Sequence, residues 1–80
     1  MMEITMTFPT ESSAKEAGKW LRFFTSGRYT QPSELELVFK VSRPFLLQLL
    51  LDNIGRHIPP VDWERTEVTI DDLSPGSPKP

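Results

Sequence analysis

The 80-residue chain contains no cysteine and a single histidine, His57, and both shortages restrict its chemistry. The lack of cysteine excludes a disulfide framework, a thiolate zinc site and a cysteine nucleophile. Any mechanism that needs two imidazoles is excluded as well. No apolar run approaches the ~20 residues that cross a bilayer, and the N-terminus has neither the basic segment nor the cleavage site of a secretory signal. We therefore expect a small cytoplasmic domain with no cofactor and no membrane partner.

Glycine and serine are also poorly placed for catalysis. The four glycines are isolated from one another and form no phosphate-binding loop. The serines lie where caps, turns or the C-terminal tail are predicted, not beside a base that would activate them. No spacing of the histidine and the carboxylates matches a known metal site. We expect no catalytic and no metal-binding residues.

Positive charge is in the minority, because 9 Lys and Arg face 11 Asp and Glu, for a formal net charge of −2. Proteins that hold a phosphate backbone are usually basic, so the composition disfavours nucleic acid as a partner. One basic stripe is nevertheless predicted on the first helix, formed by Lys15, Lys19 and Arg22. We interpret it as a solvated helix face, with weak nucleic-acid binding as an alternative.

Alternating segments predict strands that are buried on one side. In residues 3–8 and again in residues 35–41, apolar and polar side chains alternate. A third strand, over residues 63–71, has Trp63 out of phase with the rest, which indicates a bulge or a late start. Residues 28–31 are a candidate for a short edge strand.

Two helices are predicted between these strands. The first begins at a capping box headed by Ser13 and closes at Gly27, a residue type suited to the left-handed position after a helix. The second is capped by Ser42 and stops at Gly55. The Pro59-Pro60 pair then predicts an extended connector.

The predicted order of strand, helix, short strand, strand, helix and strand is typical of an α+β fold. With the short strand counted, the order resembles the ferredoxin-like βαββαβ arrangement, in which two helices cover one face of a mostly antiparallel sheet. Without it, a three-stranded βαβαβ sheet under two helices is the alternative. We expect one compact domain over residues 1–73, followed by a disordered Pro/Ser/Gly tail at residues 74–80.

The second helix carries more apolar side chains than one docking surface uses. At ~100° per residue, its leucine, isoleucine and phenylalanine residues cover roughly two thirds of the circumference. A domain of this size has no third layer to cover the surplus, and exposed apolar patches mark interaction surfaces. We therefore predict an interface for a partner protein or a second copy, with Leu47, Leu51 and Ile54 on the free side, unless neighbouring aromatic residues cover that side. The full set of predicted interface residues is Leu46, Leu47, Leu50, Leu51 and Ile54.

Carboxylates gather on the predicted open face of the sheet and near the last strand. The predicted acidic recognition surface comprises Glu34, Glu36, Glu64, Glu67, Asp71 and Asp72. RNA recognition motifs share the ferredoxin-like order but place aromatic and basic residues on the open face, so the resemblance does not extend to RNA binding. An acidic surface instead steers toward a basic partner surface.

The composition, the second helix and the acidic surface together favour a small non-catalytic protein–protein interaction module, as a homodimer or on a foreign partner. By analogy of size and charge with small phage-encoded inhibitors of nucleic-acid machinery, an accessory or inhibitor role is the leading interpretation. The alternative is a small ligand-sensing dimer similar to ACT domains. Those domains favour a glycine in the first strand–helix loop, and this chain has none there.

Overall fold

The computed structural model describes residues 1–72, with only the backbone of Asp72. The predicted tail at residues 74–80 and the boundary at residue 73 lie outside the described residues. Seven elements follow one another along the chain: β1 (Met2–Thr7), α1 (Glu11–Thr25), β2 (Tyr29–Ser33), β3 (Glu36–Val41), α2 (Pro44–His57), α3 (Pro60–Arg65) and β4 (Glu67–Asp72). No helix in this part of the chain is both long enough and apolar enough to span a membrane.

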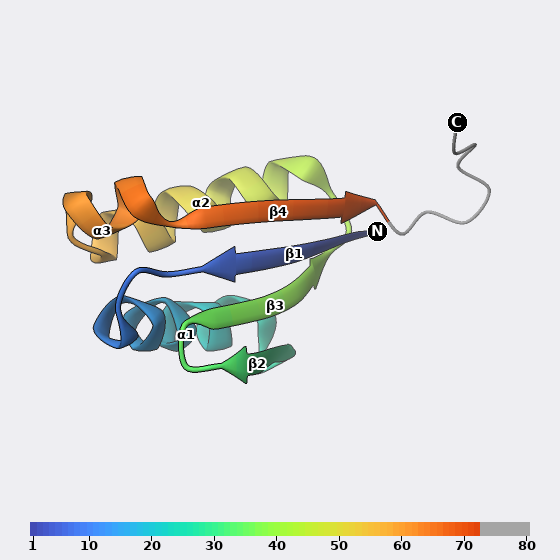
Figure 1. Cartoon of the computed structure of the whole chain (residues 1–80). Coiled ribbons are helices and arrows are strands. Elements are labelled where there is room, and N and C mark those ends of the chain that lie inside the picture. Colours follow the sequence, from blue (N-terminus) through green and yellow to red (C-terminus); the bar gives the residue numbers. More distant parts are fainter. Residues whose placement is uncertain (73–80) are drawn as a thin grey trace, which may run out of the picture.

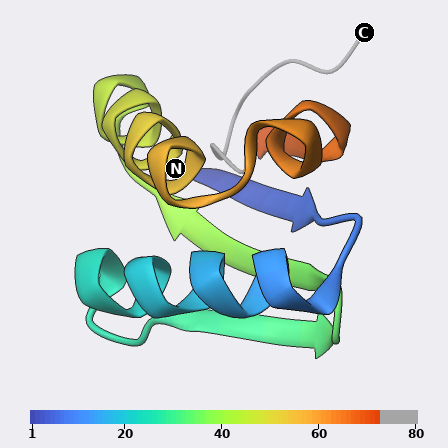
Figure 2. The ribbon, with the colours of Figure 1, turned by 90° about the vertical axis from the view of Figure 1, so that its left-hand side faces the viewer.

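The strands form one antiparallel sheet in the order β2-β3-β1-β4. Helices α1 and α2 lie on one face of this sheet, and the ribbon leaves the other face open (Figure 1, Figure 2). The predicted α+β class is therefore confirmed, and the presence of β2 excludes the three-stranded alternative. β1 occupies the interior of the sheet, between β3 and β4.

The core lies between the sheet and the helices. Because side chains alternate across a strand, β1 and β3 each turn one set of apolar residues toward α1 and α2. The alternation predicted for these two strands is confirmed by their burial. The buried apolar residues are Ile4, Met6, Phe8, Ala14, Ala17, Leu21, Leu37, Phe39, Val41, Leu47, Leu50, Ile54 and Ile58.

Helix α1 begins earlier than predicted. Its N-cap is Thr10, whose Oγ1 accepts a hydrogen bond from the backbone N–H of Ser13 at 3.2 Å. Ser13 is not the cap: it is buried in the first turn, and its Oγ donates to Asp62 Oδ2 at 2.5 Å. At the other end, Ser26 and Gly27 both have positive φ, 55° and 82°, so the predicted left-handed conformation of Gly27 is confirmed but starts one residue earlier.

Helix α2 neither starts nor ends as predicted. Arg43, not Ser42, is the N-cap residue, and it makes no side-chain capping bond. The helix runs past Gly55 to His57. Gly55 is instead required by a close approach, because a Cβ at this position would lie 2.9 Å from Cε2 of Trp63.

The segment after α2 is helical where an extended connector and a strand were predicted. Pro60 occupies the first turn of α3, where its missing N–H leaves no helical bond unmade and its fixed φ suits the helix. Trp63 belongs to this helix, which explains why it is out of phase with the strand residues. β4 begins only at Glu67, so the late start of the last strand is confirmed.

Candidate functional site

The side of α2 that faces water is not the predicted one. Leu47 is only 7% exposed and Ile54 is fully buried, so the prediction that they lie on the free side is wrong. Leu50 also belongs to the core, and Leu51 is partly buried against it. Of the predicted interface residues, Leu46 alone is exposed. Apolar residues surround so much of this helix that its periodicity does not reveal which side docks on the sheet.

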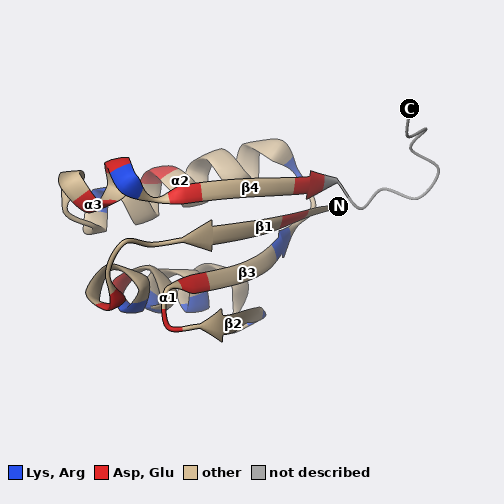
Figure 3. Ribbon diagram, viewed as in Figure 1, with Lys and Arg blue, Asp and Glu red and all other residues tan. Residues whose placement is uncertain are grey.

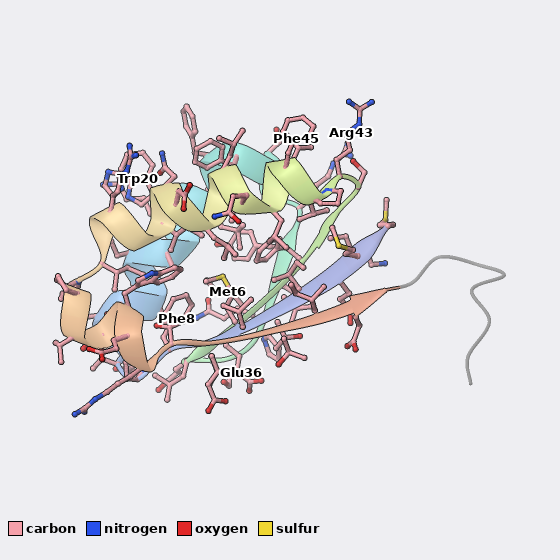
Figure 4. The ribbon with its side chains drawn as sticks, turned by 90° about the horizontal axis from the view of Figure 1, so that it is seen from above. Met6, Phe8, Trp20, Glu36, Arg43 and Phe45 are labelled. Carbon is pink, nitrogen blue, oxygen red and sulfur yellow. The ribbon has the colours of Figure 1, made fainter. Side chains whose placement is uncertain are left out.

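The large apolar side chains that α2 does expose lie in its N-terminal half. Phe45 and Leu49 are 54% and 58% exposed, and Leu46 lies between them in the sequence. Phe45 projects from the start of the helix, away from the sheet (Figure 4). The last turn of α1 adds Phe24, which is 45% exposed. Phe45 and Leu49 were not among the predicted interface residues.

Three of these residues border a groove between the end of α1, the end of β3 and the start of α2. We call it the apolar groove, and its volume is about 340 Å³. Val41 and Leu50, both buried, belong to its base, whereas Phe24, Leu46 and Leu49 are its exposed apolar residues. Its lining comprises Phe24, Thr25, Arg28, Lys40, Val41, Ser42, Leu46, Leu49 and Leu50.

The charged residues that line the apolar groove, Arg28 and Lys40, are both cationic. The chain as a whole carries a net charge of −2, so the groove has the sign opposite to the average. A surface that combines apolar walls with cations complements apolar side chains flanked by carboxylates.

The open face of the sheet carries part of the predicted acidic surface. The strand register places Glu36 and Glu67 on either side of Thr7, and Asp71 beside Glu3 near the other end of β4. Figure 3 shows these acidic positions at the ends of the strands, with uncharged residues between them. The structure therefore brings Glu36 and Glu67 into one row, while Asp71 lies in a separate row.

Two other residues of the predicted acidic surface lie elsewhere. Glu64 is on α3, outside the sheet. Glu34 lies in the connection between β2 and β3, next to Glu11 in the first turn of α1. A hydrogen bond between the two carboxyl groups, together with their like charges, raises the pKa of Glu34. Because Glu34 and Glu64 lie off the sheet, the acidic rows there are smaller than predicted. The side chain of Asp72 lies outside the described part of the chain.

The predicted basic stripe forms a surface of its own. Lys15, Lys19 and Arg22 are exposed on α1. Together with Tyr29 and Gln31 of β2 they border a second, more polar groove of about 310 Å³. The three cations are thus gathered where α1 meets the β2 edge of the sheet, apart from the acidic rows.

The single histidine, His57, and the carboxylate of Asp62 both make contacts within the fold. The His57 ring centroid lies 3.8 Å from that of Trp20, and its Nδ1 is 2.9 Å from the Asn53 carbonyl oxygen. Asp62, besides its bond to α1 described above, accepts a hydrogen bond from Thr10 Oγ1 at 3.0 Å. Within residues 1–72, no group of three or more His, Asp or Glu residues is placed to hold a metal ion.

Comparisons with protein-family models, with curated proteins and with solved structures find no match to this chain. The function must therefore be inferred from the apolar groove, the charged rows and the edges of the sheet.

Proposed function

We propose that the chain is a non-catalytic protein–protein interaction module that docks on a partner protein through the apolar groove. The observation that carries this proposal is the exposure of Phe24, Leu46 and Leu49 in the lining of one groove. Each large apolar side chain left in water forgoes about 1.5–3 kcal/mol of burial. Contiguous patches of this kind usually mark interaction surfaces.

The lining of the groove supports a partner segment of defined chemistry. Arg28 complements a carboxylate, and the exposed leucine and phenylalanine residues accept large apolar side chains. Lys40 also borders the groove, but strand alternation places its side chain on the open face of the sheet, beside Glu3. An amphipathic helix whose apolar side is flanked by Asp or Glu meets both requirements, and such helices bind in hydrophobic grooves. An accessory or inhibitor role follows if that helix belongs to a working surface of the partner.

Selection of helical peptides from a random library on the immobilised protein tests this proposal. We expect the enriched peptides to combine large apolar residues at i, i+3 and i+4 spacing with Asp or Glu. Leu49→Asp should weaken their binding about tenfold or more, because it places a charge against the apolar side of the peptide. Arg28→Glu should weaken binding and reverse its response to salt, because it replaces a cation of the groove by an anion.

Val61→Asp is the matched control for the groove. Val61 on α3 is 57% exposed, almost the same as Leu49 at 58%, and it does not line the groove. This substitution should leave peptide binding unchanged. Equal weakening by both substitutions would contradict the proposal. A wild-type dimer that becomes monomeric in Leu49→Asp would also contradict it, because a second copy would then fill the groove.

A further inference from the structure

The two edges of the sheet are built differently. β2 contains Pro32 and a register shift between Thr30 and Ser33. Proline and bulges keep an edge strand from pairing with another chain. β4 pairs with β1 through six consecutive residues without a shift, and it contains no proline, glycine or lysine. Within residues 1–72 no other strand pairs with its outer side, so its outward backbone groups are open to a further strand.

β4 also exposes apolar side chains on the helix side of the sheet. In the register, Val68 and Ile70 lie opposite Met6 and Ile4, which are fully buried. Val68 is nevertheless 37% exposed and Ile70 51% exposed, so the helices leave this edge partly uncovered. Figure 4 separates the two sides of the sheet: Met6 lies between the sheet and α2, and Glu36 lies on the opposite side.

The open side of the same strand is acidic at two positions. Glu67 and Asp71 lie on this side with Thr69 between them, next to Thr7 and Glu3 of β1. Residues 67–71 therefore follow the pattern acidic, apolar, neutral, apolar, acidic.

This pattern decides which strand fits the edge. A second copy that pairs antiparallel in the register matching residues 67–71 would place Glu67 of one copy opposite Asp71 of the other at both ends. Like charges directly opposite each other destabilise a strand pair. A strand with Lys or Arg at these two positions forms opposite-charge pairs instead.

We propose that β4 is a strand-addition site for an extended segment of a partner protein with the pattern basic, apolar, any residue, apolar, basic. Backbone hydrogen bonds to β4 would extend the sheet, the apolar residues would pack on Val68 and Ile70, and the basic residues would pair with Glu67 and Asp71. The site shares no residue with the apolar groove and does not rest on the function proposed above.

Fluorescence anisotropy with the full chain and labelled peptides tests the site. The probe contains the core Lys-Val-Thr-Val-Lys, one control peptide replaces both lysines by glutamate, and another replaces both valines by serine. We expect the probe to bind about tenfold more tightly than either control peptide. Added probe should slow amide hydrogen exchange in residues 67–72 and leave residues 29–33 unchanged.

Substitutions in β4 test which of its side chains determine the affinity for the probe. The double change Glu67→Lys and Asp71→Lys should reverse the preference, so that the glutamate peptide binds more tightly than the lysine probe. Ile70→Lys should weaken the probe about tenfold. Leu49→Asp should leave probe affinity unchanged, which separates a failure of this site from a failure of the apolar groove.

Several results would overturn the site. These are the absence of probe binding at millimolar concentration, equal binding of the valine and serine peptides, and an unchanged preference in the charge-reversed variant. A wild-type dimer that Ile70→Lys dissociates would assign the edge to a second copy. Probe binding that appears only after residues 74–80 are removed would assign it to the chain's own tail.

Discussion

Replacing Gly55 by alanine tests whether Trp63 packs against α2 as closely as the structure shows. In a helix interior, a change from glycine to alanine alone stabilises by about 0.8–1 kcal/mol. At Gly55, however, the added Cβ would lie 2.9 Å from Cε2 and 3.0 Å from Nε1 of Trp63. Overpacking of this kind costs about 1–3 kcal/mol. We therefore expect Gly55→Ala to lie between neutral and about 2 kcal/mol less stable than the wild type.

Gly18→Ala is the matched comparison. Gly18 also lies inside a helix, but the nearest atom to an added Cβ is the Tyr29 hydroxyl oxygen at 3.6 Å, an ordinary contact. This variant should keep the full gain of about 0.8–1 kcal/mol. The two variants should therefore differ in unfolding free energy by about 1–3 kcal/mol. Urea and thermal denaturation followed by circular dichroism measure the difference, at about 4–8 °C in Tm for each kcal/mol.

The same substitution in a Trp63→Leu background completes the comparison. With the indole removed, Gly55→Ala should recover its stabilisation of about 0.8–1 kcal/mol. If Gly55→Ala stabilises the wild-type chain as much as Gly18→Ala does, Trp63 does not lie against this glycine. The explanation for a glycine in the last turns of α2 would then be refuted.

Two further predictions concern hydrogen-bonded carboxyl groups. Asp62→Ala should lower the unfolding free energy by about 1–3 kcal/mol, because buried Ser13 loses its acceptor; a urea midpoint equal to that of the wild type would contradict this. Glu11 raises the pKa of Glu34 above its ordinary value of 4.5, so the folded chain binds the proton of the Glu34 carboxyl more tightly than the unfolded chain does. The free energy of unfolding therefore falls as the pH rises from the ordinary pKa through the raised one. Glu34→Gln should therefore be more stable than the wild type at neutral pH but not at a pH well below the ordinary pKa. An equal gain at both pH values would exclude Glu11 as the cause.

Strand alternation is enough to place β1 and β3, because a sheet with one covered face imposes a period of two on the sequence. The docking side of α2 is harder to predict, since leucine occurs on nearly every side of it. Gln48 and Asp52 nevertheless mark the side in water, and they share a hydrogen bond there at 3.2 Å. Phe45 and Leu49 precede Gln48 and Asp52 by three residues each, so they share one face of the helix with these polar residues, and the polar positions predict their exposure better than the apolar ones do.

The segment after α2 depends on contacts that no local pattern carries. α3 spans only six residues, too few for a helical period to show in the sequence. A Pro-Pro pair suits an extended chain as well as a helix start. The hydrogen bond of Ser13 could not be predicted for a related reason: its acceptor, Asp62, is 49 residues further along the chain.

The position of β1 inside the sheet affects how the chain is completed. It precedes the other three strands of this sheet along the chain, yet its two neighbours are β3 and β4, which comes after all of them. Until residues 67–72 leave the ribosome, the side of β1 that pairs with β4 is an open strand edge. Unpaired strand edges in incompletely folded chains favour aggregation. A chain truncated shortly before Glu67 would therefore lose the pairing of β4 and would also expose β1 as an edge strand that can pair with another chain.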